Sequence, residues 1–346
     1  MTFLRNAWYV ALWGQDLPPG ELVARTFLNE PVILFRDNEG IARALVDWCP
    51  HKFAPLHRGK FTDTGSIRCA YHGLEFDAEG ACVYNPHGKT PKQGVRAYPV
   101  AEKHSLIWIW MGDSDRADPA AIPDFSILDP DRDADTQVSK RDWIKMEAGY
   151  ELITDNLLDL SHVSFLHEGI LGNEDTIAAD TIVDHEGDRI YARRLMENVR
   201  VPGLFDLLFK GDGGRVDLWN DIRWDAPGCM MNDAGVTDPG GAHEDGTGIF
   251  GTHFLTPETE RTTYYHFAAV RQNPRPVAPD IAEELRHKLS ELRHIAFAEQ
   301  DAPIIEAQQL RFDAATARGE APTLLAIDKG PVAYKRVLKK LIDAET

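Results

Sequence analysis

Two short stretches of this chain each pair a cysteine with a histidine, and this pairing restricts the fold more than any other feature. Cys49 and His51 lie in CPHKFAPL, and Cys69 and His72 lie in CAYHG, a little further along the chain. The chain has only four cysteines, so half of them stand next to histidines in this way. Thiolates and imidazoles are the usual protein ligands of transition metals. The pattern therefore predicts a metal centre held between two loops.

The composition narrows the setting in which such a centre would work. The chain has 346 residues and a formal net charge of -18, which argues against nucleic acid or an anionic membrane surface as a partner. It contains no run of about 18 apolar residues, so we expect no membrane-spanning helix. Its first residues, MTFLRNAWYVALWGQDLPPG, lack the long apolar core of a signal peptide. We therefore expect a cytoplasmic protein, whose patterned cysteines and histidines bind metal rather than form disulfides.

The distribution of ligands between the two loops favours one kind of centre. Zinc sites with two cysteines and two histidines usually take both cysteines from one element and both histidines from another. Here each loop offers one of each, which suits a Rieske [2Fe–2S] cluster, where two cysteines bind one iron and two histidines bind the other. Structural zinc and a chance arrangement stay open as alternatives. The remaining cysteines lie outside the loops, and we interpret Cys82 as a strand residue and Cys229 as a core or pocket residue.

A second group of candidate ligands lies in the stretch DNLLDLSHVSFLH. Asp159, His162 and His167 follow one another there in a segment with helical periodicity. Five residues on an ideal α-helix turn two side chains about 140° apart, so the histidines converge only where the helix widens or unwinds. Two histidines and one carboxylate form the facial triad of mononuclear non-haem Fe(II) oxygenases, and the carboxylate can come from a distant segment. The alternative is a pair of core histidines on an apolar helix.

The chain divides into an all-β first third and a mixed remainder. PVILFR and IARALVDW flank DNEG, which is a hairpin pattern. The stretch 118–135 is rich in proline and aspartate and is predicted as a linker between domain 1–117 and domain 136–346. No P-loop and no dinucleotide-binding glycine motif occurs, which argues against ATP or a dinucleotide as a ligand. In the second domain we expect helices at 148–167, 278–313 and 331–345, and strands near 181–199, 216–224, 249–255 and 262–271.

These motifs together resemble a known family. The whole chain is similar to the oxygenase component of Rieske non-haem iron monooxygenases, and most of all to the subgroup with vanillate O-demethylase, dicamba O-demethylase and toluenesulfonate methyl-monooxygenase. The helix matches the family pattern D-x3-D-x2-H-x4-H at Asp155, Asp159, His162 and His167. The shared stretches are FLRNAWYVA, CPHKFAPL, CAYHGLEF, LIWIWMGD, DNLLDLSH and LTPETE.

The resemblance implies an α+β fold and two cofactors. An all-β Rieske domain would precede a catalytic domain in which an antiparallel sheet covers long helices, the helix-grip or Bet v1-like arrangement. The implied cofactors are a Rieske [2Fe–2S] cluster and a mononuclear Fe(II). Lys52 departs from relatives, which usually carry arginine there, and this leaves the ligands intact. The cluster ligands would be Cys49, His51, Cys69 and His72.

The resemblance also assigns roles around the mononuclear iron. His162 and His167 would bind it together with a late-helix aspartate, which the stretch FAEQD places at Asp301. Asn156 would lie near the iron without binding it. Relatives form homotrimers, and Asp159 would relay electrons between His72 of one chain and His162 of the next; its simpler role would be to orient His162. The competing carboxylates for the third position are Glu299 and Glu306.

Partners and substrate follow from the same resemblance. Electrons would come from a ferredoxin, an NAD(P)H-dependent reductase or both. The basic stretch 52–68 is either a docking patch for an acidic partner or part of a subunit contact. Asn232 and His253 would orient a small aromatic acid, although a strand histidine with an internal partner would explain His253 equally well. We expect a monooxygenase that uses O2, with O-demethylation first and N-dealkylation or ring or methyl hydroxylation next. A Rieske electron carrier and a zinc-stabilised binding module are the non-enzyme alternatives.

Overall fold

The computed structural model describes residues 3–129, 138–276 and 278–345 and divides the chain into two compact units. The first unit runs to Ile122 and also takes in Thr256–Glu260 and Glu345; the second holds Pro123–Leu255 and Arg261–Ala344. The division therefore falls inside the stretch 118–135 that we predicted as a linker. Residues 130–135 of that stretch lie outside the described residues. The described part contains short 3-10 helices at Pro119–Ala121 and Ser126–Leu128.

The first unit is built from strands, as its alternating apolar runs predict. Its three sheets have the strand orders β1-β11-β10, β2-β3-β4-β9 and β5-β6-β7-β8. Every residue of β1 and β11 is buried, which fits strands covered on both faces rather than at a surface. The strands are β1 (Trp8–Trp13), β2 (Val23–Phe27), β3 (Glu30–Arg36), β4 (Ala42–Val46), β5 (Lys60–Phe61), β6 (Ile67–Arg68), β7 (Glu75–Phe76), β8 (Cys82–Tyr84), β9 (Ala97–Tyr98), β10 (Val100–Lys103) and β11 (Leu106–Trp110).

The second unit contains one seven-stranded antiparallel sheet in the order β12-β18-β17-β16-β15-β14-β13. Buried and open positions alternate along β14, so one face of this strand is covered. The strand expected at 181–199 is a hairpin, because the chain turns at Gly187, whose φ of 63° suits glycine. The strands are β12 (Asp142–Met146), β13 (Ile182–Glu186), β14 (Arg189–Arg200), β15 (Arg215–Asp225), β16 (Cys229–Thr237), β17 (Thr247–Thr259) and β18 (Thr262–Gln272).

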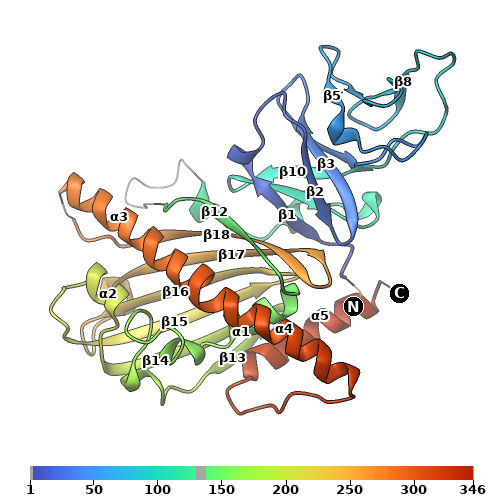
Figure 1. Cartoon of the computed structure of the whole chain (residues 1–346). Helices are drawn as coiled ribbons and strands as arrows, with labels where there is room; N and C mark the ends of the chain where they lie inside the picture. The colour runs from blue at the N-terminus through green and yellow to red at the C-terminus, as the bar shows by residue number, and fades with distance from the viewer. Residues whose placement is uncertain (1–2, 130–137, 277, 346) are drawn as a thin grey trace. The chain divides into compact units, whose positions relative to one another are not determined.

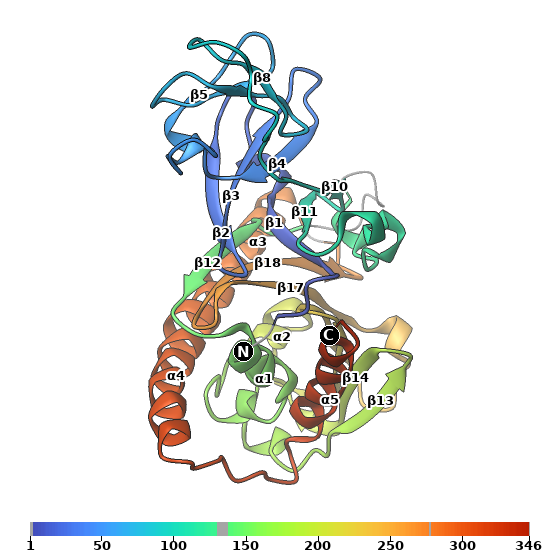
Figure 2. The ribbon, with the colours of Figure 1, turned by 90° about the vertical axis from the view of Figure 1, so that its right-hand side faces the viewer.

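Helices cover one face of this sheet, with the run from α3 to α4 lying across it (Figure 1). This run was expected as one helix broken near Pro303. The break comes earlier: a π-helical segment, Ile295–Asp301, joins the two helices, and Pro303 lies in the first turn of the second. Figure 2 shows α1, α2 and α5 on the same unit. The helices are α1 (Tyr150–Leu158), α2 (Gly203–Leu208), α3 (Pro279–His294), α4 (Ala302–Ala317) and α5 (Lys329–Asp343).

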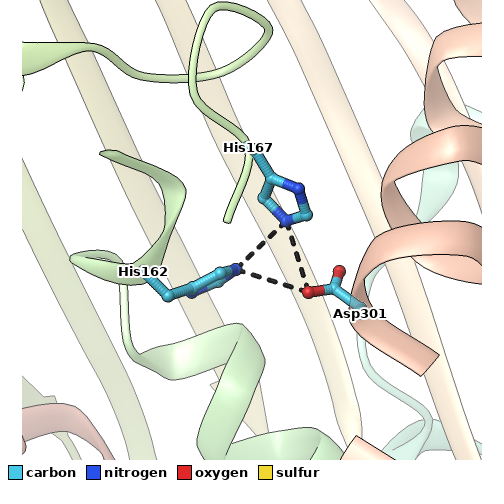
Figure 3. Close-up of side chains that lie close together, drawn as sticks. All are labelled: His162, His167 and Asp301. Atoms are coloured by element: carbon cyan, nitrogen blue, oxygen red, sulfur yellow. Dashed lines mark hydrogen bonds and ion pairs between the residues drawn. The ribbon is translucent and has the colours of Figure 1, made fainter. Parts of the chain in front are cut away.

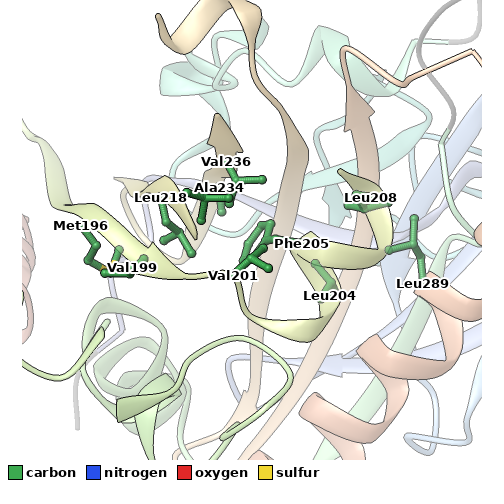
Figure 4. Packing of buried hydrophobic residues seen from close by; sticks show 11 residues of the cluster. Met196, Val199, Val201, Leu204, Phe205, Leu208, Leu218, Ala234, Val236 and Leu289 are labelled. Atoms are coloured by element: carbon green, nitrogen blue, oxygen red, sulfur yellow. The ribbon is translucent and has the colours of Figure 1, made fainter. Parts of the chain in front are cut away.

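An apolar core joins α2 and α3 to strands β14, β15 and β16 (Figure 4). Leu204, Phe205 and Leu289 belong to this core and also line the cavity described below, so the core positions one wall of the site. The observed architecture confirms the predicted α+β class, with an all-β first unit and a sheet-and-helix second unit. Among the described residues, every helix is too short or too polar to cross a bilayer. The remaining core members are Met196, Val199, Val201, Leu208, Val216, Leu218, Ala234 and Val236.

Candidate cluster and iron sites

The two Cys/His loops of the first unit have the same backbone design. One follows β4, and the other joins β6 to β7. In each loop the amide of the cysteine donates to the carbonyl five residues later, at 2.8 Å for both Cys49 and Cys69. The residue four positions after each cysteine then adopts a left-handed conformation, with φ of 54° at Phe53 and 75° at Gly73. Such turns let each loop fold back so that its cysteine and histidine face the other loop.

The four predicted cluster ligands form two layers. Cys49 and Cys69 are each 2% exposed and pack in one apolar core, whereas His51 is exposed and its ring centroid lies 4.5 Å from that of His72. Both thiols are free. Burial, together with the neighbouring Cys69, raises the pKa of Cys49 to about 11. A thiolate pair at this place therefore requires a cation to hold it.

This layered arrangement fits a two-iron cluster and not a single ion. A single metal ion needs its ligand atoms close together. Within the described part of the chain, just one group of three or more His, Cys, Asp or Glu residues has its ligand atoms within 4.8 Å of one another, and that group belongs to a different site. The Cys/His set is thus too widely spaced for one tetrahedral zinc, but it suits buried sulfurs on one iron and outer imidazoles on a second. We propose Cys49, His51, Cys69 and His72 as the cluster ligands.

The surroundings of the cluster loops contain a histidine that the sequence pattern did not single out. The Nε2 atom of His87 lies 3.1 Å from the carbonyl oxygen of His72, and the two ring centroids are 6.3 Å apart. His87 comes from outside both loops, and its spacing carries no signal of this position. The predicted basic stretch is also less charged than its composition suggests, because Arg68 forms an ion pair of 2.6 Å with Glu75.

The second site begins where α1 ends. The helix was expected over 148–167, but it stops at Leu158 and a 3-10 turn at His162–Ser164 follows, so neither histidine lies on it. Their Nε2 atoms lie 3.3 Å apart. One carboxylate oxygen, Oδ1 of Asp301 at the end of the π-helical segment, lies 3.7 Å from His162 Nε2 and 3.3 Å from His167 Nε2. Figure 3 shows the three side chains converging on one point.

Hydrogen bonds fix which nitrogen of each histidine faces this point. The Nδ1 atom of His162 bonds to the backbone carbonyl of Asp159, and that of His167 lies 2.7 Å from Oε1 of Gln300. Both Nε2 atoms are therefore left free to bind a metal. Burial lowers the pKa of His162. Burial also acts to lower the pKa of His167, but the hydrogen bonds and charge of Asp301 and Gln300 outweigh this effect, so the pKa of His167 is raised. Two imidazoles and one carboxylate suit Fe(II) with open positions.

Other predicted residues take distinct places around this group. Asn156 donates from Nδ2 to Oδ1 of Asp301 at 3.1 Å, so it lies beside the triad without joining it. The competing carboxylates lie elsewhere: Glu299 is exposed, and Glu306 accepts a hydrogen bond from the Glu147 amide. The carboxylate of Asp159 accepts from the amide and the hydroxyl of the residue two positions later.

The triad lines a cavity of about 110 Å³ in the second unit. Its walls come from α1, α2, α3, the π-helical segment and strands β15 to β18, and most lining side chains are apolar. The predicted residues Asn232 and His253 line it on β16 and β17. Asn220 and Arg293 also line it, which the sequence pattern did not indicate. This volume is below that of an engineered apolar cavity of about 150 Å³ that binds benzene, so the space is of the order of a single small ring.

Two family models match the chain over these two units. Residues 7–99 match the Rieske [2Fe-2S] domain, and residues 146–344 match the vanillate O-demethylase oxygenase C-terminal domain. The first match contains both Cys/His loops, and the second contains the whole triad. The cofactors are accordingly a Rieske [2Fe–2S] cluster and mononuclear non-haem iron.

Curated relatives and solved structures match over the full length. The oxygenase component of dicamba O-demethylase from Stenotrophomonas maltophilia is 36% identical, over 100% of this chain and 99% of the relative. The oxygenase component of chloroacetanilide N-alkylformylase from Rhizorhabdus wittichii is also 36% identical, over 99% of this chain and 97% of the relative. A crystal structure of dicamba monooxygenase bound to 3,6-dichlorosalicylic acid superposes with a TM-score of 0.92 at 35% identity, covering 100% of this chain and 99% of the other. The chain belongs to the Rieske non-haem iron oxygenases, as the oxygenase component of such a system.

Proposed function

We propose that this oxygenase removes the methyl group from a small methoxylated aromatic acid. The observation that carries the proposal is the cavity itself: the triad and the polar pair Asn232 and His253 line one ring-sized apolar space. A pocket of this kind holds a ligand by a few placed polar groups and leaves its other end near the reactive centre. The relative named dicamba O-demethylase, similar over the full length, supports the same reaction class.

The polar pair would hold the acid end of the substrate. Asn232 pairs with Gly251 across β16 and β17, so His253 lies two residues further along the neighbouring strand on the same face. The side-chain oxygen of Asn232 is buried and has no hydrogen-bond partner among the described residues. This unpaired oxygen needs a hydrogen-bond donor, whereas a carboxylate only accepts, so the acid would bind the amide nitrogen of Asn232. Ile249 and Phe297 lie along the same cavity and would contact the ring.

The chemistry balances as a demethylation. Iron bound by His162, His167 and Asp301 would activate O2 with electrons supplied through the cluster. One oxygen atom enters a C–H bond of the methoxy group, and the resulting hemiacetal releases formaldehyde and leaves the phenol. The other oxygen atom leaves as water after taking up two electrons and two protons. The apolar walls of the cavity exclude bulk water from the ring and its methoxy group.

Electron supply involves other protein components. An oxygenase component of this family receives its electrons from a separate reductase or ferredoxin. We further propose a homotrimer in which Asp159 relays electrons from His72 of one chain to His162 of the next. The bonding of Asp159 supports this role, because its backbone carbonyl already orients His162 and its carboxylate is not needed for that task.

The domain assignment and the compartment also stay proposals. We propose a Rieske domain at 1–117, a linker at 118–135 and a catalytic domain at 136–346. The division between the compact units at Ile122 supports a boundary in this region. The cytoplasm stays the predicted compartment.

N-dealkylation is the second candidate reaction. It is supported by the chloroacetanilide N-alkylformylase, which is as similar to this chain as dicamba O-demethylase is. The same hydrogen abstraction at a carbon next to nitrogen instead of oxygen would release the alkyl group as an aldehyde. Ring or methyl hydroxylation would use the same cavity without release of a carbon fragment. The non-enzyme alternatives do not account for a triad that lines a ring-sized cavity.

The test is turnover with a substrate panel. The enzyme, supplied with NADH, a reductase, a ferredoxin and O2, is given methoxybenzoates, N-alkyl anilides and methyl arenes, and products are identified by mass spectrometry. We expect a methoxybenzoate to give the phenol and formaldehyde, with about one formaldehyde for each O2 consumed, since the reaction is a monooxygenation. A clear preference for substrates without an O-methyl group would contradict the demethylase proposal.

A further inference from the structure

The two ring nitrogens of His253 have different surroundings. The ring is 4% exposed, and its Nδ1 atom lies 2.6 Å from the hydroxyl oxygen of Tyr265 on β18. The Nε2 atom lies beside Gly251, where an added Cβ would come within 3.1 Å of it. We propose that Tyr265 is a positioning residue: its hydroxyl donates to Nδ1 and holds the ring in the form that donates Nε2–H into the cavity, so that the pocket selects an anionic head group. This rests on the proposed function, because it names the end of the substrate that is recognised.

The direction of the Tyr265 hydrogen bond follows from what surrounds the hydroxyl. Tyr265 is 2% exposed, and among the residues that the structure describes its hydroxyl has a single hydrogen-bond partner, Nδ1 of His253. A buried O–H group without an acceptor is strongly disfavoured, so the phenol proton is donated to this nitrogen. A neutral imidazole carries one proton, which must then lie on Nε2.

His253 and Tyr265 both stay neutral near neutral pH. Burial, followed by the charge of Arg293, lowers the pKa of His253 to about 3. Burial also raises the pKa of Tyr265 well above its ordinary value, so the phenol keeps its proton. The pair therefore acts as a fixed hydrogen-bond chain from Tyr265 through His253 to the cavity, and each bond in such a chain strengthens the next.

The missing side chain at Gly251 leaves room at the donating nitrogen. A Cβ there would lie 3.7 Å from Cβ of Asn232 as well as close to His253 Nε2. The space between the imidazole and the amide is thus one that a glycine keeps open. An oxygen atom of a carboxylate or sulfonate placed there would accept a hydrogen bond from His253 and approach the side chain of Asn232.

The cavity lining includes Arg293 and Asp301, and the proposed iron would bind the carboxylate of Asp301. Arg293 lines the same cavity and is 9% exposed, and its guanidinium donates to the hydroxyl of Ser139 and to the Lys140 carbonyl at 2.8 Å. Within residues 3–129, 138–276 and 278–345, it forms no ion pair with a carboxylate. A buried cation that lacks a carboxylate partner is stabilised by an incoming anion. A neutral amide or an amine would gain nothing from this charge.

The test compares an acid with its neutral isostere in binding, without turnover. 4-Methoxybenzoate and 4-methoxybenzamide are titrated calorimetrically into the resting holoenzyme, with both metal centres loaded and no electron donor. The wild-type protein should prefer the acid. Tyr265→Phe should weaken binding of the acid about threefold to tenfold, the effect of one net hydrogen bond, and bring its affinity closer to that of the amide. Tyr264→Phe, one residue earlier on the other face of β18, should leave both affinities within about twofold, because Tyr264 is buried against Trp143 and does not line the cavity.

A second background separates positioning from a general structural role. His253→Gln places an amide N–H near the position of Nε2, and this donor does not need the Tyr265 hydroxyl to fix a tautomer, so the variant should keep much of the acid affinity. Tyr265→Phe should then cause no further loss in that background, which is the signature of coupled residues in a double-mutant cycle. Equal losses in both backgrounds would overturn the proposal, and so would a wild-type protein that binds the amide as tightly as the acid.

Gly251→Ala supplies an independent variant in case the tyrosine variant folds poorly. Its φ lies outside the left-handed region, and its methyl group should lower acid affinity about tenfold by filling the space at Nε2. Unchanged acid affinity in Gly251→Ala would also contradict the proposal. These measurements are independent of demethylation: a protein that prefers the acid but releases no formaldehyde during turnover would refute the proposed function alone.

Discussion

At the scale of single residues, hydrogen bonds orient the two histidine rings of the triad without any metal present. A backbone carbonyl fixes His162, and the side chain of Gln300 fixes His167. Such outer hydrogen bonds commonly change metal affinity about 10–100-fold when they are lost. Neither partner could be foreseen from spacing, because Gln300 comes from a helix far along the chain and the other is a backbone atom. Of these residues, only the two histidines and Asp301, the last residue of FAEQD, were singled out from the sequence.

His162→Ala should remove the mononuclear iron and keep the cluster. The substitution deletes one of three proposed iron ligands in the second unit and changes no residue of the Cys/His loops. Iron should fall from about three to about two atoms per chain, while the acid-labile sulfide stays at about two. Colorimetric iron and sulfide assays, with the visible spectrum as a check on the cluster, measure this. Loss of sulfide together with iron would contradict the assignment of separate sites.

Asp159→Asn should keep both metals and still reduce turnover severely. The carboxylate is not the group that orients His162, so the change removes charge from the proposed relay without freeing the ring. The readout is reoxidation of the reduced cluster in a single turnover, together with metal content. Asp155→Asn is the matched control, because that carboxylate bonds instead to Tyr334 and Lys335. Near-normal turnover in Asp159→Asn would refute the relay.

At the scale of elements, the unwound segment after α1 is held from β14. Arg194 is 2% exposed and donates to the carbonyl of Leu160 at 2.7 Å and to those of Thr176 and Ala179 at 2.9 and 2.8 Å. One buried guanidinium thus satisfies three backbone carbonyls of the loop that follows α1. This explains how a chain can stop a helix early and keep the following loop in a defined shape.

Arg194→Met should lower the free energy of unfolding by about 3 kcal/mol, because several buried carbonyls lose their donor. The loop that carries His162 would loosen, so mononuclear iron should also dissociate more readily. Thermal unfolding and an iron-retention assay against a chelator measure the two effects. Arg193→Met is the control: this neighbour is exposed and its ion pair with Asp184 of 2.9 Å lies at the surface, where such pairs contribute about 0–1 kcal/mol. Equal effects of both substitutions would contradict the bracing role.

Helices and strands could be predicted from the sequence where the apolar periodicity was strong. They were harder to predict where a turn or tertiary packing determined the structure. The strand runs VILF and LIWIW and the amphipathic α5 could be predicted from pattern alone. Strand β16 was not expected as a separate element, since its composition, with Gly235 and Asn232, is poor in β-branched residues. The π-helical segment was also missed, because nothing in local sequence distinguishes it from the α-helices on either side.

At the scale of the whole molecule, two metal centres belong to one chain and should be loaded together. The purified protein should contain about three iron atoms and two sulfides per chain and, once reduced, give a Rieske-type EPR signal. The proposed ligands, the buried Cys49 and Cys69 and the outer His51 and His72, would account for two of the irons. Elemental analysis measures the ratio. Stoichiometric zinc without sulfide at the Cys/His loops would contradict it.

The proposed trimer makes a prediction that a monomer could not meet. If electrons pass from the cluster of one chain to the iron of its neighbour, a chain without a cluster and a chain without mononuclear iron can each supply what the other lacks. His51→Ala removes an exposed residue proposed as a cluster ligand, and His162→Ala removes a proposed iron ligand. Each variant alone should be inactive, whereas co-expressed chains in mixed trimers should recover a measurable share of formaldehyde release.

Size-exclusion chromatography with differently tagged chains isolates the mixed species. A chain carrying both substitutions, mixed with itself, is the control and should stay inactive, because it holds neither a donor nor an acceptor. Failure of the mixed species to recover activity would place electron transfer within one chain.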